Sequence, residues 1–96
     1  MHRYETITIF DGDTPEDERK SGLERIESII SKRNGTLLDF DDWGLRKLAY
    51  PIRKKNQGHY VRVDYCGDGT IVEAIEQMLR HDQRTLRFMT VRQQAD

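Results

Sequence analysis

Residues 43–62 read WGLRKLAYPIRKKNQGHYVR, and this stretch contains six Lys or Arg residues and no acidic residue. Its flanks are net acidic, because the formal charge is −5 over residues 1–42, +6 over residues 43–62 and −2 over residues 63–96. Proline cannot donate a hydrogen bond to a strand ladder, so Pro51 predicts that part of the stretch is the edge strand of a sheet. The stretch therefore predicts a sheet edge and a local concentration of positive charge, which the net charge of −1 conceals.

The length of 96 residues fits a single domain, which we place at residues 1–92, followed by a short flexible tail at residues 93–96. Hydrophobic residues make up 35% of the chain and recur with regular spacing, which favours a folded chain over a disordered one. The single cysteine excludes an internal disulfide and favours a reducing compartment. No leader peptide or membrane-spanning run is recognisable, so we expect a cytoplasmic protein without a membrane anchor.

The residues before the basic stretch predict a strand and then a helix. Residues 3–10 are β-branched and aromatic and carry apolar side chains on both faces, as a central strand does. Thr14 and Pro15 predict the start of a helix, with Thr14 as the cap and Pro15 at the first helical position. Apolar residues then recur at helical spacing up to Asn34-Gly35, a pair that suits the left-handed backbone at a helix end.

Residues 36–66 predict two strands joined by a hairpin. Leu38 and Phe40 are expected to share one face of the first strand, and Gly44 is expected to interrupt that strand with a bulge. Residues 54–58 have the polar, Gly-containing composition of a hairpin tip. In the strand that follows, period-two spacing predicts three core residues, Val61, Val63 and Tyr65.

Residues 70–92 predict a second helix and a last strand, because Thr70 and Glu73 match a capping box and residues 84–92 are rich in strand formers. The order strand, helix, strand, strand, helix, strand (βαββαβ) predicts an α+β fold of the ferredoxin-like type. In that fold, two helices cover one face of a four-stranded antiparallel sheet. Right-handed crossovers give the strand order 4-1-3-2, which places the second strand at an edge and leaves the other sheet face open.

Residue types that carry catalysis or bind metals are present, but their pattern supports neither. The histidines and the single cysteine match no nucleophile or metal-ligand spacing, and no Gly-rich phosphate loop follows a strand. The acidic residues within 11–18 lack the pattern of a calcium loop and are interpreted as a solvated helix start. Those within 39–42 are interpreted as charges that protect a strand edge. We therefore predict no enzyme activity, no cofactor and no metal site.

The basic stretch is open to two interpretations, RNA binding or a merely solvated surface. Its cations can neutralise phosphates, and the interleaved rings of Trp43, Tyr50 and Tyr60 can stack on bases. The pI of the whole chain, near 6.3, argues against a generally basic surface. Charge and composition leave both interpretations open.

Residues 44–53, GLRKLAYPIR, resemble the signature of the bacterial small-subunit ribosomal protein S six family. That signature reads glycine, any residue, basic, polar, Leu, Ala, Tyr, any residue, Ile, and a basic or polar residue. Tyr4-Glu5, residues 57–60 and residues 84–92 agree as well, so the resemblance extends over essentially the whole chain. It implies a ferredoxin-like ribosomal protein that forms a heterodimer with ribosomal protein S eighteen and binds the central domain of small-subunit ribosomal RNA. Some members of that family also bind the leader of their own messenger RNA.

The resemblance also implies roles for individual residues. Arg46, Lys47 and Arg53 match the basic positions of the signature and are expected to face phosphate or the partner. The apolar positions are expected mainly to lock the edge strand onto the sheet. The candidate RNA-binding residues are Arg3, Arg46, Lys47, Arg53, Lys54, Lys55, Arg80, Arg84, Arg87 and Arg92. The candidate partner-binding residues are Trp43, Leu45, Tyr50 and Tyr60.

The chain departs from the family pattern at two points. The tail lacks the long acidic extension that some members carry, which argues against modification of the tail by added glutamates. Thr6 and Thr8 make the first strand more polar than is usual there, so the core-facing side of that strand is left open.

Two alternatives come from other functional classes. One is a ferredoxin-like regulatory module that dimerises through the open sheet face and binds no nucleic acid. The other is a small acyl-phosphate hydrolase of the same fold, for which the acidic sequence Asp11-Gly-Asp-Thr14 is unfavourable because an anion would lie there.

Overall fold

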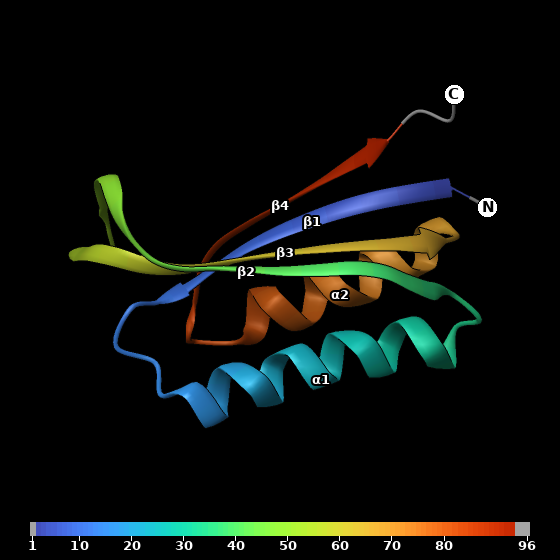
Figure 1. Cartoon of the computed structure of the whole chain (residues 1–96), viewed down its shortest axis with the longest axis horizontal. Coiled ribbons are helices and arrows are strands. Elements are labelled where there is room, and N and C mark those ends of the chain that lie inside the picture. Colours follow the sequence, from blue (N-terminus) through green and yellow to red (C-terminus); the bar gives the residue numbers. More distant parts are fainter. Residues whose placement is uncertain (1, 94–96) are drawn as a thin grey trace.

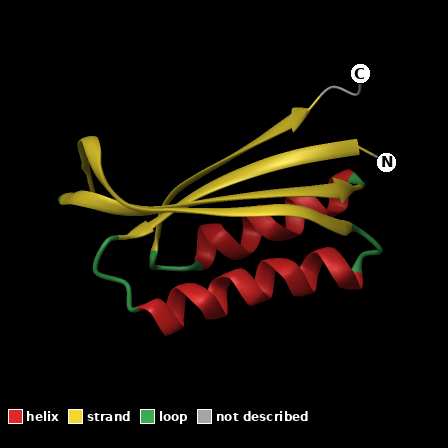
Figure 2. Ribbon diagram, viewed as in Figure 1, coloured by secondary structure: helices red, strands yellow, loops and turns green. Residues whose placement is uncertain are grey.

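Strands and helices follow one another in the predicted order in the computed structural model, which describes residues 2–93. The four strands form one antiparallel sheet in the order β2-β3-β1-β4, and both helices lie on the same face of it (Figures 1 and 2). This arrangement confirms the ferredoxin-like α+β fold. Gln93 is the last residue of β4, and residues 94–96 of the predicted tail lie outside the described residues. The elements are β1 (His2–Asp11), α1 (Glu16–Lys32), β2 (Thr36–Ile52), β3 (Lys55–Gly67), α2 (Gly69–His81) and β4 (Thr85–Gln93).

The main core lies between the sheet and the two helices. Strand β3 is central and contributes the three residues predicted from its alternation, all of them almost completely buried. They pack against one apolar face of each helix, because residues spaced three or four apart lie on the same side of a helix. The buried members of this core are Phe10, Ile26, Ile30, Val61, Val63, Tyr65, Ile71, Ile75 and Leu79.

Strand β1 is central as expected, and it directs its threonines toward the helices. Thr6 and Thr8 pair with Val63 and Val61, which face the core, and both threonines are fully buried. The Thr6 hydroxyl is hydrogen-bonded to the hydroxyls of Tyr65 and Thr90, at 2.9 and 2.8 Å. Buried hydroxyls are tolerated when they are paired, so the polarity of Thr6 is compatible with a core position. The Thr8 hydroxyl is buried without a hydrogen-bond partner among the described residues.

Helix α1 ends as predicted but begins one residue later. Pro15 is its N-cap and accepts no side-chain capping bond, so the prediction of Thr14 as the cap is wrong. The Thr14 hydroxyl is instead buried without a hydrogen-bond partner among the described residues. At the other end, Asn34 has a left-handed backbone (φ 62°), and the Gly35 N–H donates to the Ile30 carbonyl over 2.8 Å. These two features terminate the helix in the way expected of an Asn-Gly pair.

Helix α2 is capped by a residue that the sequence pattern did not single out. Asp68 is the N-cap, and its carboxylate accepts the Thr70 N–H over 2.9 Å. The predicted capping box of Thr70 and Glu73 is therefore wrong, because Thr70 already lies inside the helix. An ionised Asp satisfies an unpaired N–H and also complements the positive end of the helix dipole.

Strand β2 lies at the sheet edge, as Pro51 predicted, and is irregular. The predicted bulge occurs at Gly44, which has φ 80° and lies at a register shift. A second shift lies between Leu37 and Asp39, so that Leu37 pairs with Tyr65 and Phe40 with Val63, both on the helix side. The expected alternation of Leu38 with Phe40 is therefore wrong, because the extra residue in a bulge reverses the alternation.

The β2–β3 hairpin is longer than predicted. Ile52 pairs with Lys55, and the connection is a two-residue turn of Arg53 and Lys54, whose φ angles are 50° and 65°. Residues 55–58 belong to β3, so the prediction of a tip over residues 54–58 is wrong. Two consecutive left-handed residues match the twist of a hairpin, but Asn-Gly or Asp-Gly usually occupy them, and this turn therefore has no sequence signal.

The end of the hairpin folds over the sheet face that lies away from the helices. Leu48 is buried there against Ile9 and Leu86, and this second small core also contacts Ile52 and Tyr60. Figure 1 shows this end of the hairpin rising from the sheet on the side opposite the helices. The sheet face that was predicted to be open is therefore covered at one end.

Candidate nucleic-acid interface

The ten candidate RNA-binding cations lie at two ends of a molecule that is 38 Å long. Arg3 and Arg92 lie on β1 and β4, at the end of the molecule where β1 begins and β4 ends (Figure 1). Arg92 Nη2 donates to His2 Nδ1 there, over 2.7 Å. The other eight lie toward the opposite end, on the hairpin, the last turn of α2, the loop before β4 and the start of β4 (Figure 1). The fold thus brings together most of these cations, but not all ten.

Two of the eight cations at the hairpin end are neutralised by carboxylates. Lys55 Nζ lies 3.3 Å from an Asp11 oxygen and 3.5 Å from an Asp13 oxygen, and these carboxylates raise the pKa of the Lys55 ammonium group. Arg84 donates to both oxygens of Asp82, over 2.9 and 3.0 Å, and this pairing lowers the pKa of the Asp82 carboxyl. Both cations have a partner within the fold and are less available to an external phosphate.

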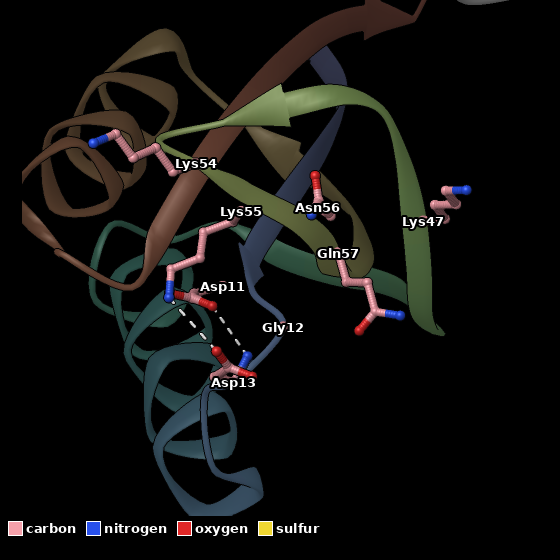
Figure 3. Close-up of a pocket in the computed structure, with 8 residues that line it drawn as sticks. All are labelled: Asp11, Gly12, Asp13, Lys47, Lys54, Lys55, Asn56 and Gln57. Carbon is pink, nitrogen blue, oxygen red and sulfur yellow. Dashed lines mark hydrogen bonds and ion pairs between the residues drawn. The ribbon is translucent and has the colours of Figure 1, made fainter.

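A shallow hollow next to the hairpin brings together three lysines and two aspartates. Figure 3 shows Lys55 reaching across it to Asp11 and Asp13, while Lys54 and Lys47 point away in different directions. Asn56 and Gln57 complete its lining with neutral polar groups. Because its charges largely balance, this hollow does not concentrate positive potential on one point.

A second hollow concentrates arginines instead. It lies between the hairpin tip, the end of α2 and the start of β4, and Arg53, Arg80 and Arg87 all line it. All three side chains are exposed. The sequence prediction included these arginines but gave no reason to group them, because they are separated by up to 34 positions along the chain.

The four candidate partner-binding residues do not form one surface. Trp43 and Tyr60 stack, with ring centroids 6.4 Å apart and an interplanar angle of 22°. Leu45 pairs with His59 on the helix side of the sheet and lies beside Gly12. Tyr50 extends in the opposite direction, where its hydroxyl accepts a hydrogen bond from Arg87 Nη1 over 2.8 Å.

Sequence reasoning missed two exposed apolar residues on the sheet face away from the helices. Met89 and Val91 of β4 are 53% and 48% exposed, and they pair with Ile7 and Glu5 of β1 on that face. The strict alternation of β4, with Phe88 and Thr90 directed inward, is the signal that could have found them. We call Ile7, Trp43, Tyr60, Met89 and Val91 the outer-face apolar patch.

The described residues contain neither a metal-ligand cluster nor a membrane-spanning helix. Within residues 2–93, no group of three or more His, Cys, Asp or Glu side chains is placed to hold a metal ion. None of the described helices is long and apolar enough to cross a membrane. His59, on β3, contacts the Asp42 carboxylate over 2.7 Å.

Comparisons with known proteins agree on one family. A family model described as ribosomal protein S6 matches residues 3–92. The chain is 50% identical over 91 residues to the small ribosomal subunit protein bS6 of Desulfosudis oleivorans, covering 95% of this chain and 54% of that protein. It is 38% identical over 92 residues to the bS6 protein of Caldanaerobacter subterraneus subsp. tengcongensis, covering 96% and 97%. The chain thus spans about half the length of some curated relatives and nearly all of others.

A solved structure gives the same result for the fold. The crystal structure of 30S ribosomal protein S6 from Thermotoga maritima superposes with a TM-score of 0.88 at 32% sequence identity. The match covers 96% of this chain and 87% of that protein.

Proposed function

The chain belongs to the ribosomal protein S6 family, and on this premise we propose that it is a structural component of the small ribosomal subunit. In this role it binds small-subunit ribosomal RNA together with ribosomal protein S eighteen. The observation that carries the proposal is the family match over residues 3–92, which includes the basic hairpin and the last strand. As part of the ribosome, the protein is located in the cytoplasm.

The family is structural and non-enzymatic, and the site geometry agrees with that role. RNA binding requires exposed cations at phosphate spacing and needs no nucleophile or general base. The regulatory module and the hydrolase considered from sequence gain no support from the comparisons, which identify a ribosomal family instead.

RNA contact is assigned to the hairpin end of the molecule. Six candidate cations there, Arg46, Lys47, Arg53, Lys54, Arg80 and Arg87, have no carboxylate within ion-pair distance among residues 2–93. Their charge is therefore available to phosphates, whereas that of Lys55 and Arg84 is already compensated. Because they project from a hairpin, a helix end and a strand, they can follow the phosphate backbone of a folded RNA.

The partner protein is assigned to the outer-face apolar patch. Exposed Met89 and Val91 on β4, and the Trp43–Tyr60 stack on β2 and β3, provide flexible apolar and aromatic side chains of the kind enriched in protein interfaces. The helix side of β2 also exposes apolar residues, namely Leu37, Phe40 and Leu45. The hollow that Leu37 and Phe40 line is shared with Lys20, Glu24 and Glu27 of α1, so charged side chains interrupt its apolar surface.

Salt dependence of binding tests the RNA role. If about four to six phosphates are neutralised, log affinity for small-subunit ribosomal RNA with the partner present should fall against log salt with a slope of about −3 to −5. A flat salt response, or no binding in the presence of the partner, would refute this role.

A pair of matched substitutions tests the partner surface. Val91→Glu should abolish heterodimer formation in size-exclusion chromatography, because it introduces a charge into the outer-face apolar patch. Leu45→Glu introduces the same charge on the opposite sheet face and should leave the heterodimer intact. The reverse result would assign the partner to the helix side of the hairpin.

A further inference from the structure

The cations at the hairpin end differ in the partners that hold them. Lys55 and Arg84 are held by carboxylates, which cancel their charge. Arg53, Arg80 and Arg87 are instead oriented by neutral groups, which fix a side chain without cancelling its charge. The three arginines line one hollow, and none of the residues that line it is acidic.

Each of the three arginines has a different neutral contact. Arg53 Nη1 donates to the backbone carbonyl of Gln83 over 3.3 Å. The guanidinium carbon of Arg80 lies 5.7 Å from the centre of the Phe88 ring, a cation–π geometry. Arg87 Nη1 donates to the Tyr50 hydroxyl over 2.8 Å. Each contact uses only part of a guanidinium group, which has five N–H donors.

The contact between Tyr50 and Arg87 joins the two edges of the sheet. Tyr50 belongs to β2 and Arg87 to β4, and the other two strands lie between them. The contact forms because the hairpin folds over the sheet, with Leu48 buried against Ile9 and Leu86. The same fold places Arg53, at the hairpin tip, beside Arg80 and Arg87. The hollow therefore exists only while the hairpin is docked.

We propose that Arg53, Arg80 and Arg87 form a discrete site for one phosphate group of RNA, and that the Tyr50 hydroxyl positions Arg87 in that site. This assignment rests on the proposed function and names one contact within it. Three guanidinium groups with free donors match the oxygens of a phosphate, and their planar forks add geometric selectivity that lysines lack. They also outweigh the partial negative charge at the C-terminal end of α2.

Tyr50 is a positioning residue and touches no phosphate itself. Removing its hydroxyl leaves Arg87 charged but free to adopt other rotamers, so a binding loss in Tyr50→Phe would come from orientation alone. Leu48 continues to hold the hairpin in that variant, so the fold is expected to persist.

Charge-neutralising variants test the site against a general field effect. Arg87→Gln and Arg53→Gln should each lower affinity for ribosomal RNA with its partner about tenfold and make the salt slope less steep by about one. Lys20→Gln, an exposed cation on α1, removes the same formal charge away from the hollow and should change affinity less than about twofold with an unchanged slope. Equal losses in all three variants would overturn the proposal.

A double-mutant cycle tests the role of Tyr50. Tyr50→Phe should lower affinity about threefold in the wild-type background and have no effect when Arg87 is already Gln, because the hydroxyl acts only through that arginine. Its urea midpoint should match that of the wild type. Independent, additive losses would refute the positioning role.

Inorganic phosphate distinguishes a free anion from RNA as the ligand. The wild type is titrated with phosphate, and sodium chloride at the same ionic strength serves as the control. Phosphate should bind only at millimolar concentration, because an isolated anion lacks the neighbouring contacts of the RNA chain. Micromolar phosphate binding that needs the three arginines, with RNA affinity unchanged by their removal, would assign the site to a free anion and overturn the proposal. Failure of the wild type to bind RNA would instead refute the proposed function itself.

Discussion

The hydroxyl groups of Thr6 and Tyr65 lie 2.9 Å apart inside the core, and a 2.8 Å contact extends this pair to Thr90. The three residues belong to β1, β3 and β4, so a chain of hydroxyls crosses the centre of the sheet. Because each hydroxyl has a partner, the buried polarity is compensated. These hydrogen bonds between hydroxyls also fix side-chain positions across three strands.

Replacing Tyr65 with Phe should lower the free energy of unfolding by about 1 kcal/mol, the usual net value of a hydrogen bond whose remaining partner stays satisfied. Thr6 keeps its contact with Thr90 in this variant, so no buried hydroxyl is left unpaired. Urea unfolding followed by circular dichroism measures the change. Tyr4→Phe is the matched control, since Tyr4 packs against Tyr65 at 5.8 Å but lies outside the hydroxyl chain. Equal losses in the two variants would contradict this account.

The stability of the fold should decrease at alkaline pH partly because of the same residue. Burial raises the pKa of the Tyr65 hydroxyl above its ordinary value. Below about pH 10 the phenol is protonated in both the folded and the unfolded state, so its stabilising contribution is fully present there. As pH rises toward the raised pKa, only the unfolded state ionises freely and stability is lost. Urea unfolding between about pH 9 and 11 should therefore show a steeper loss for the wild type than for Tyr65→Phe. Parallel curves would show that Tyr65 titrates normally.

Replacing Gly58 with Ala should destabilise the hairpin by about 1 to 3 kcal/mol, as overpacking of a filled site does. A Cβ at this position would clash with Ile9 Cγ2 and lie 3.4 Å from Leu48 Cδ2, within the small core that docks the hairpin. Gly69→Ala is the control, because a Cβ there meets no atom within 4 Å at the first position of α2. In thermal unfolding, Gly58→Ala should have a lower melting temperature than Gly69→Ala. Similar melting temperatures would show that the small core around Leu48 accommodates the added methyl group without loss of stability.

Truncating Leu48 to Ala should cost about 2 to 4 kcal/mol of folding stability, which is typical of a buried leucine. Leu48 is 7% exposed, whereas Leu45, three residues earlier on the same strand, is 52% exposed. Leu45→Ala should therefore change the free energy of unfolding by less than about 0.5 kcal/mol. If both substitutions were equally mild, the hairpin would not be docked on the sheet in solution.

Local sequence patterns predicted the element order, the core face of β3 and the edge position of β2. Each of these depends on a short-range signal: the period of two in Val61, Val63 and Tyr65, the spacing of apolar residues in both helices, and the missing donor of Pro51. The sequence could not say which side of β1 is buried, because the Thr6 hydroxyl finds its partners only on β3 and β4, and the Thr8 hydroxyl is buried without a hydrogen-bond partner within residues 2–93.

The errors occurred where a neighbouring residue could replace the predicted one. Asp68 instead of Thr70 caps α2, and Arg53-Lys54 instead of residues 54–58 form the hairpin turn. A single extra residue after Leu37 reversed the expected alternation in β2. Moving a helix cap, a turn or a bulge by one or two residues changes the local free energy little. The packing of the whole domain therefore decides which position is occupied.

The candidate site was predictable as a list of cations but not as a geometry. Lys55 meets Asp11 across 44 positions of sequence, and Tyr50 meets Arg87 across 37. Both contacts depend on how the hairpin docks, which no local pattern encodes. These long-range contacts separate the compensated cations from those available to RNA.

Sedimentation of cell extract through a sucrose gradient tests the central claim most directly. The account predicts that the protein travels with the small ribosomal subunit at low salt and is released as salt rises, because phosphate contacts weaken with ionic strength. A protein that remained at the top of the gradient at low salt, as a free monomer or homodimer, would contradict the assignment to the ribosome.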